Sequence, residues 1–203
     1  MRVAVLTFDG FNELDSFIAS ALFNRLRERG WQAQITCPSE QVTSMNGVRV
    51  EAQQPLEFAR EADVVLFGSG IKTREIAQDA SILERLQLDP GRQLIGAQCS
   101  GTLLMAKLGL LQALPACTDL TTKPWVVEAG VEVLNQPFYA RGNLATAGGC
   151  LAAPYLAAWA ITRLAGEQVS AEVLHYVAPV GEKEAFVERA LQVIRPCLPD
   201  STV

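Results

Sequence analysis

The chain has 203 residues, of which 49% are hydrophobic and 19% are charged, a composition typical of a globular α/β protein with a full core. Its formal net charge of -5 argues against a surface that binds nucleic acid. The longest apolar stretch, residues 150–166, is interrupted by Pro154 and is too short to cross a bilayer, so we expect no membrane partner.

The cysteine pattern indicates a reducing compartment. Five cysteines are scattered without a C-x-x-C pair, and the chain has one histidine. An odd number of scattered cysteines does not suit a disulfide framework, and the spacing does not suit zinc, so we expect neither a metal nor a cofactor. The first ten residues read as a strand rather than as a signal peptide. We therefore expect a cytoplasmic protein.

Strand-like and helix-like segments alternate from the first residue. The strand-like runs are residues 2–8, 32–37, 62–70 and 92–98, and the helix-like ones are 12–29, which ends at Gly30, and 81–88. Such alternation predicts a mostly parallel sheet with helices on both faces.

The later part of the chain is less regular. Residues 124–149 predict short strands around a Gly/Asn turn, followed by a buried helix over 150–164. A final amphipathic helix is expected over about 182–195. Because we find no internal repeat, low-complexity tract or linker, we expect residues 1–203 to form a single domain.

Three strand ends carry residues that suggest a site. In open parallel sheets, ligands bind at the carboxyl ends of the strands. The acid-rich segment 8–15 follows the first strand, Gly68 to Gly70 closes the third, and Cys99 follows the fourth. We expect the site to lie where these loops converge.

Cys99 lies at a predicted strand-to-helix corner, because an apolar strand runs directly into it and a helical pattern begins at once. Such a corner strains the backbone and points the side chain at the free N–H groups of the next helix. The helix N-terminus favours negative charge, which predicts a lowered pKa for the thiol. A small buried hydrophobe is the alternative interpretation. The small neighbours Ala97 and Gly101 favour the nucleophile.

Helical spacing separates the acids of the first loop. The apolar stripe of this helix is Phe11, Leu14, Asp15, Ile18 and Leu22. Asp9 and Glu13 fall outside it, and we expect them to be solvated. Desolvation would raise the pKa of Asp15 and let it donate to a thiolate or move protons. The equally weighted alternative is a first-turn acid that complements the helix dipole and turns to solvent.

Backbone N–H groups near Cys99 are candidates for an oxyanion site. Ser69 and Gly70 are candidates in the glycine turn, because glycine permits close approach. Ser100 contributes its own N–H, and its hydroxyl either holds a substrate oxygen or caps the helix.

The remaining thiols and the imidazole are weaker candidates. A Cys–His dyad would have to use His175, which we interpret as structural. Cys150 opens a helix after the sequence TAGG and is expected in the same pocket, as a wall residue or a resolving thiol. Three further cysteines are expected at packing or surface positions: Cys37, Cys117 and Cys197.

Together these segments resemble the ThiJ/PfpI superfamily, the class I glutamine amidotransferase-like fold. The matching segments are VAVLTFDGFNELD, VVLFGSG, IGAQCSGTLLMAKLGLL and NLATAGGCLAAPYLAAWAITRLAG. The resemblance implies a flavodoxin-like three-layer sandwich, usually a homodimer. It also implies a reactive cysteine, Cys99, that is hydrogen-bonded to the helix acid, Asp15.

Two positions of this chain depart from patterns that are common in the superfamily, and they narrow the choice of branch. Family proteases and glyoxalase-type members often carry histidine directly after the cysteine, where this chain has Ser100. Isocyanide hydratases and the amidotransferase-like halves of some regulators lack that histidine and tend to have Asp at the acid position. Many of them carry histidine where this chain has Asp119. The resemblance is therefore nearest to the isocyanide hydratase-like branch, and peptidase activity and DNA binding are disfavoured.

Three functions follow. The first is a cysteine-dependent hydratase or amide hydrolase for a small-molecule substrate, with Cys99 as nucleophile and Asp15 as acid/base partner. The second is a non-catalytic redox-sensing or stress-protective protein that uses oxidation of Cys99. The third is a ligand-binding regulator. The candidate pocket residues are Asp119, Gly148, Gly149 and Cys150.

Overall fold

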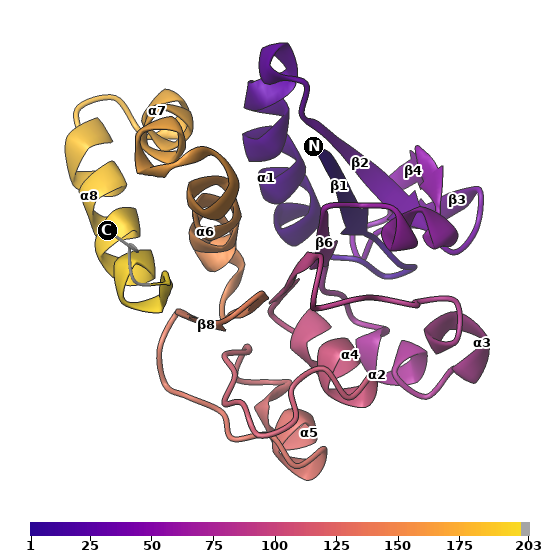
Figure 1. Cartoon of the computed structure of the whole chain (residues 1–203). Helices are drawn as coiled ribbons and strands as arrows, with labels where there is room; N and C mark the ends of the chain where they lie inside the picture. The colour runs from indigo at the N-terminus through magenta and orange to yellow at the C-terminus, as the bar shows by residue number, and fades with distance from the viewer. Residues whose placement is uncertain (200–203) are drawn as a thin grey trace.

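The computed structural model describes residues 1–199 and contains a seven-stranded sheet with helices on both sides (Figure 1). In spatial order the strands are β5 (Gln54–Pro55), β2 (Gln32–Cys37), β1 (Arg2–Leu6), β6 (Val64–Phe67), β7 (Leu94–Gln98), β9 (Leu144–Ala147) and β8 (Phe138–Arg141). Neighbouring strands are parallel except β8 and β9, which form an antiparallel hairpin. The predicted mostly parallel sheet is confirmed.

Two hydrophobic cores lie on opposite faces of the sheet. In β1, Val3 and Val5 belong to one core, whereas Ala4 and Leu6 belong to the other, because successive side chains of a strand point to opposite faces. The first core holds α1 (Glu13–Phe23), α6 (Ala153–Ala165), α7 (Glu167–Val177) and α8 (Lys183–Ile194). The second holds η2 (Leu56–Arg60), α2 (Thr73–Ile76), α3 (Ala80–Leu83), α4 (Gly101–Lys107) and α5 (Lys123–Glu128). The flavodoxin-like three-layer sandwich is therefore confirmed.

Several predicted elements need new bounds. The helix predicted over 12–29 consists of α1 and the 3-10 helix η1 (Asn24–Arg29), and it ends as predicted at Gly30, whose φ is +78°. The surface helix predicted over 81–88 is wrong beyond one turn, since α3 stops at Leu83. The helix predicted over 150–164 begins as the 3-10 turn η3 (Cys150–Ala152) and continues as α6.

The prediction of short strands over 124–149 is wrong for its first part. That part forms α5, because Pro124 suits the first turn of a helix and Asp119 accepts the N–H groups of Thr121 and Thr122 just before it. The second part is the β8–β9 hairpin around Gly142 and Asn143, as predicted. Residues 1–199 contain no helix with the length and apolar character needed to cross a membrane.

Chain order around β1 positions the site. β2 lies on one side of β1 and β6 on the other. The strand order therefore changes direction at β1: the chain first adds strands on one side of β1 and then adds the rest on the other side. The loops after β1 and β6 come into contact there, and Phe11 pairs with Gly70 in an isolated bridge. A Cβ at Gly70 would lie 2.4 Å from the carbonyl oxygen of Gly10, so only glycine permits this approach. This is the topological position at which open α/β sheets bind ligands.

Candidate active site

The strained corner predicted at Cys99 is confirmed. Cys99 has a φ of +47°, in the left-handed region that non-glycine residues rarely adopt. Its N–H donates to the carbonyl of Ala147 at 2.8 Å, and its carbonyl accepts the hydroxyl of Thr118 at 2.8 Å. The left-handed conformation is therefore held from both sides by hydrogen bonds to other segments of the chain.

Asp15 is buried, with 2% of its surface exposed, so the interpretation in which it turns to solvent is wrong. The hydroxyl of Ser69 donates to its Oδ2, whereas its Oδ1 has no hydrogen-bond partner within residues 1–199. Burial raises the pKa of Asp15, although the hydrogen bond from Ser69 opposes the shift. A buried carboxyl with an open oxygen is poised to exchange a proton with a neighbour.

The other residues of this segment correct the predicted stripe. The prediction that Leu14 lies on the buried stripe is wrong: its side chain is 48% exposed, because it lies one residue away from the buried position of Asp15. Glu13 is half-buried rather than solvated, and it accepts hydrogen bonds from Ser44 and Asn46. Asp9 is exposed, as predicted, and accepts the N–H of Thr43.

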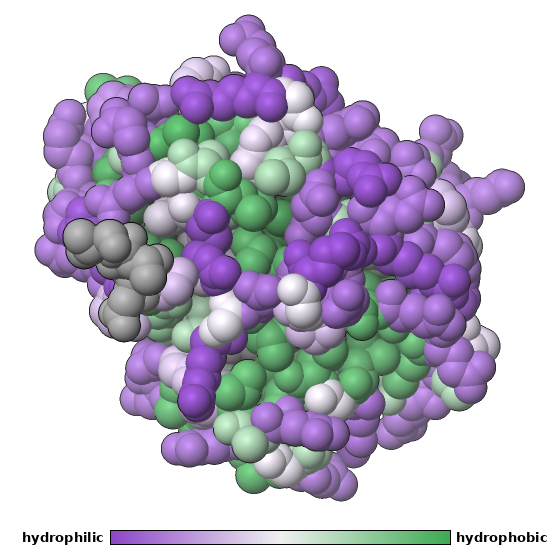
Figure 2. Space-filling view, viewed as in Figure 1, coloured by the Kyte–Doolittle hydropathy of each residue, from purple (hydrophilic) through white to green (hydrophobic). Residues whose placement is uncertain are grey.

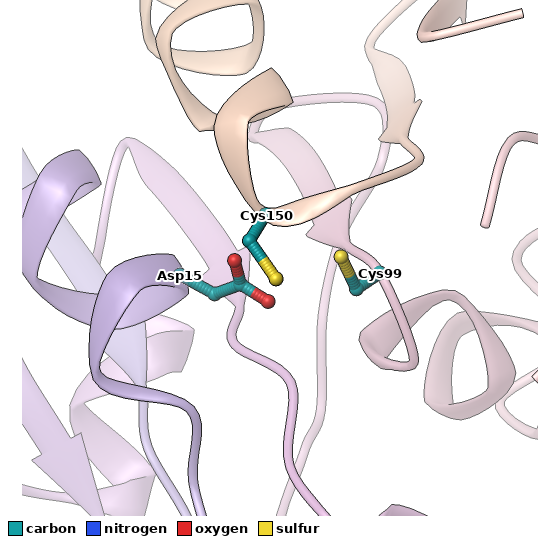
Figure 3. Close-up of side chains that lie close together, drawn as sticks. All are labelled: Asp15, Cys99 and Cys150. Carbon is teal, nitrogen blue, oxygen red and sulfur yellow. The ribbon is translucent and has the colours of Figure 1, made fainter. Parts of the chain in front are cut away.

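Three side chains from different elements converge (Figure 3). A carboxylate oxygen of Asp15 and the sulfur atoms of Cys99 and Cys150 all lie within 4.8 Å of one another. Asp15 comes from α1, Cys99 from the corner after β7 and Cys150 from η3. The predicted convergence of strand-end loops is thus realised after β1, β6, β7 and β9.

Two amide groups donate to the sulfur atoms. The Nδ2 of Asn12 lies 3.2 Å from the Sγ of Cys150, and the Nε2 of Gln98 lies 3.7 Å from the Sγ of Cys99. The same Nε2 donates to the carbonyl of Gly149 at 2.7 Å. These contacts orient both thiols without adding positive charge.

The surroundings of Cys99 do not lower its pKa, so that expectation is wrong. Burial raises the pKa of the thiol, and the negative charges of Asp15, Cys150 and Asp119 raise it further. The thiol is desolvated, and the ionisable groups facing it are acidic. Forming a thiolate therefore requires an acceptor for the proton at close range, and the carboxyl group of Asp15 is in position to be that acceptor.

The predicted oxyanion donors are reduced to two. The N–H of Gly70 is occupied, because it donates to the hydroxyl oxygen of Ser100 at 3.1 Å, and that oxygen also lies 2.8 Å from the hydroxyl of Thr73. The Ser100 hydroxyl thus fastens the glycine turn to α4 and does not cap the helix. In residues 1–199 the N–H groups of Ser69 and Ser100 have no protein acceptor.

A cavity of about 400 Å³ opens over the cluster. Its wall includes both cysteines, Ser69, Gly70 and Ser100. The remaining lining residues are apolar at Met45, Ile71 and Trp125, and polar at Asn12, Asp119, Thr121 and Thr122. The volume falls within the range of small-molecule sites.

Two of the predicted pocket residues, Gly148 and Gly149, are not among the residues that line this cavity. The N–H of Gly148 donates to the carbonyl of Pro137 at 3.0 Å, and the carbonyl of Gly149 accepts from Gln98. Their place in the structure is to position Cys150, which follows them directly.

The remaining candidates lie elsewhere. His175 is on α7, where its Nε2 is 3.6 Å from Glu184 on α8, so the structure does not bring it together with Cys99. Cys37 and Cys117 are buried in the interior, and burial raises the pKa of each to about 12. Cys197 is half-buried, and all five cysteines are free thiols.

Three contributions to the site were not predicted: the amide of Asn12, the amide of Gln98 and the hydroxyl of Ser69. Asn12 precedes the first helix as its N-cap, a position whose signal concerns the backbone rather than a distant sulfur. Gln98 is a polar residue at the end of an apolar strand, which is a usable signal for a residue that serves a site. For Ser69, the sequence predicts a role only for its N–H group.

Residues 1–163 match the family model described as the DJ-1/PfpI family, and the chain belongs to that family. The superfamily resemblance drawn from the sequence is thereby confirmed. A comparison with curated proteins finds no match.

Solved structures share the fold. A ThiJ/PfpI family protein from Pseudomonas syringae aligns with a TM-score of 0.77 at 19% identity, over 97% of this chain and 88% of that one. DJ-1beta from Drosophila melanogaster gives 0.72 at 22% identity, over 87% and 96%. An oxidized DJ-1 from Toxoplasma gondii gives 0.71 at 20% identity, over 87% and 97%.

Proposed function

We propose that the protein is a cysteine-dependent enzyme that acts on a small electrophilic carbon, as a hydratase of isocyanide-like substrates or as an amide hydrolase. Cys99 is the nucleophile and Asp15 is its acid/base partner. The observation that carries the proposal is the buried Asp15 carboxyl, with an unpartnered Oδ1, beside a thiol held in a left-handed corner under a cavity.

The first step is transfer of the Cys99 proton to Asp15 as the sulfur attacks. The pKa of Asp15 is raised by burial, which makes its carboxylate a better base, and the raised pKa of Cys99 keeps the thiol protonated until substrate arrives. A carbon–sulfur bond forms, and the electron pair displaced from the substrate carbon moves to the neighbouring nitrogen or oxygen atom. The free N–H groups of Ser69 and Ser100 lie at the same cavity to stabilise that charge.

The second step returns the proton and releases product. Asp15 gives the proton to the carbon atom of an isocyanide. In an amide it gives the proton to the nitrogen atom, the carbon–nitrogen bond breaks, and the amine leaves. Water then attacks the carbon, the carbon–sulfur bond breaks, and the thiol is restored. For an isocyanide the sum is addition of one water molecule to give a formamide, and for an amide it is cleavage to an acid and an amine.

The surroundings of the cavity support further proposals. Its volume and mixed wall suit a small-molecule substrate rather than a folded protein.

Leu14 and Phe17 on α1, together with Met45 and Ile71 of the cavity wall, are exposed apolar side chains. Figure 2 shows apolar residues gathered toward the middle of the face in view, with hydrophilic residues around them. We propose that a second copy covers these side chains in a homodimer, and that the free thiols function in the cytoplasm.

The test is turnover of a small aliphatic isocyanide, a short amide and a 2-oxoaldehyde by the purified protein. We expect Cys99→Ala to lower the rate at least about a thousandfold and Asp15→Asn to lower it about a hundredfold. Cys197→Ala, which removes a thiol outside the cavity wall, is the matched control and is expected to retain the wild-type rate. Turnover that survives Cys99→Ala would contradict the mechanism.

The same assay distinguishes the alternatives. A protein that only senses oxidation through Cys99 turns over none of the three substrates yet is modified at Cys99 by peroxide. A regulator that binds a ligand without chemistry is stabilised against heat by a compound that it does not convert.

A further inference from the structure

Cys99 has a second thiol beside it, and the proposed reaction leaves that thiol without a role. The sulfur atoms of Cys99 and Cys150 lie within 4.8 Å of each other, and both residues line the same cavity. Of the five cysteines, only these two belong to the cavity wall, since Cys37, Cys117 and Cys197 lie outside it. A small oxidant that enters the cavity therefore meets two thiols at once.

The geometry permits the two sulfur atoms to bond. A disulfide needs about 2.05 Å between them, and rotation about Cα–Cβ moves a cysteine sulfur by about 3 Å. Cys150 is half-buried and starts the short turn η3, and Gly149 before it is exposed with open space at its Cβ position. Figure 3 shows the Cys150 side chain directed into the space between Asp15 and Cys99. Rotation of the Cys150 side chain, together with adjustment of the turn around it, is the movement that would bring its sulfur onto an oxidised Cys99.

We propose that Cys99 and Cys150 form a reversible redox pair, in which a hydroperoxide oxidises Cys99 and Cys150 captures the product as an intramolecular disulfide. The inference needs only that small reagents reach Cys99, and it stands apart from the hydratase or hydrolase reaction. Its consequence for the site is protection, because a disulfide shields Cys99 from irreversible oxidation.

The chemistry balances with the groups in place. The sulfur of Cys99 attacks the outer oxygen of a hydroperoxide, the O–O bond breaks, and Cys99 becomes a sulfenic acid while the alcohol or water leaves. The Asp15 carboxylate takes up the thiol proton of Cys99 during this attack and passes it to the oxygen atom that leaves. The thiol of Cys150 then attacks the sulfur of the sulfenic acid, and the oxygen leaves as water with the Cys150 proton. A dithiol such as dithiothreitol supplies two electrons and two protons to restore both thiols.

The test is the mass of the full-length protein after exposure to about five equivalents of hydrogen peroxide, followed by alkylation and peptide mapping. The wild-type protein is expected to lose about 2 Da, with a cross-linked peptide that contains Cys99 and Cys150, and to recover with dithiothreitol. Cys150→Ser cannot form the disulfide. In that variant we expect a gain of about 32 Da at Cys99, a sulfinic acid that dithiothreitol does not reverse, formed about tenfold faster than in wild type.

Cys197→Ser is the control and is expected to behave as wild type, with circular dichroism confirming that each variant is folded. Sulfinic acid at Cys99 of the wild-type protein without the cross-link overturns the proposal. So does a cross-link between any other pair, or an equal rate of over-oxidation in Cys150→Ser. Because the readout is mass rather than turnover, its failure leaves the proposed reaction untouched, and loss of turnover leaves the redox pair untouched.

Discussion

The cavity over Cys99 and the groove between α7 and α8 each contain titratable groups, but the burial and the partners of these groups differ between the two regions. In the cavity, Asp15 is buried with an open oxygen and Cys99 occupies a left-handed conformation. In the groove, His175 and Glu184 keep 51% and 87% of their side-chain surface exposed and face each other at 3.6 Å. The cavity therefore contains features that lower stability, whereas the groove contains an ordinary surface pair.

This difference supports the proposal that the cavity is the functional region. Burying a carboxyl without a full set of partners and holding a non-glycine residue at positive φ each cost free energy. A fold keeps such features where chemistry needs them, while exposed pairs such as His175 and Glu184 occur over any protein surface. Three substitutions test this difference through the stability of the folded protein, and their expected effects differ in size.

The tight corner at the start of α4 gives the largest effect. A Cβ at Gly101 would lie 2.6 Å from the carbonyl oxygen of Gly68 and 2.7 Å from that of Phe67, both backbone atoms. We expect Gly101→Ala to lower the free energy of unfolding by about 2–3 kcal/mol in urea denaturation. In Gly91→Ala the new Cβ meets the end of the flexible Asp89 side chain at 3.0 Å, so this control is expected to change little. Equal losses in both variants would show that the corner is not tightly packed.

The buried carboxyl gives an intermediate effect that depends on pH. Burial raises the folded-state pKa of Asp15 above its ordinary value of 3.8, so the folded state binds the proton more tightly than the unfolded state. Stability from this group is therefore full below the ordinary pKa and is lost as pH rises through the folded value. We expect Asp15→Asn to gain about 1–2 kcal/mol relative to wild type between about pH 3 and pH 7. A difference that stays constant with pH would show that Asp15 is solvated in the folded protein.

The groove gives the smallest effect. Exposed ion pairs contribute little, because solvent screens them and their side chains lose entropy on pairing, so His175→Ala is expected to change stability by less than about 0.5 kcal/mol. We also expect turnover to stay within about twofold of wild type, since His175 is absent from the cavity wall. A tenfold loss of turnover with unchanged stability would show that the groove between α7 and α8, like the cavity, contributes to the reaction.

Much of the fold was predictable because its strands are buried on both faces and its long helices are amphipathic. β1, β2, β6, β7 and α8 stand where continuous apolar runs or a clear helical period placed them. The hairpin of β3 (Gln41–Thr43) and β4 (Arg49–Glu51) escaped prediction, because three-residue strands are too short for a period to show. α5 was not predicted, because its valines favour a strand. Pro124 in the first turn and the turn that Asp119 forms before it favour the helix instead.

The site was predictable as far as chain-local patterns reach. Cys99 follows from the strand-to-helix corner and Asp15 from the buried stripe, since both are local features. The electrostatics were not predictable: the helix N-terminus favoured a lowered pKa, but burial and the acids around Cys99 raise it. The sulfur contacts of Asn12 and Gln98 depend on which loops meet in space, and local patterns do not contain that information.

The three converging side chains lie where the two helical layers meet. Asp15 and Cys150 come from elements of the layer that holds α1 and α6, whereas Cys99 begins the connection to α4 in the opposite layer. A chain with only one layer docked holds Cys99 without Asp15 beside it. The assembled cluster is therefore a property of the complete fold, and the labelling rate of Cys99 reports whether both layers have docked.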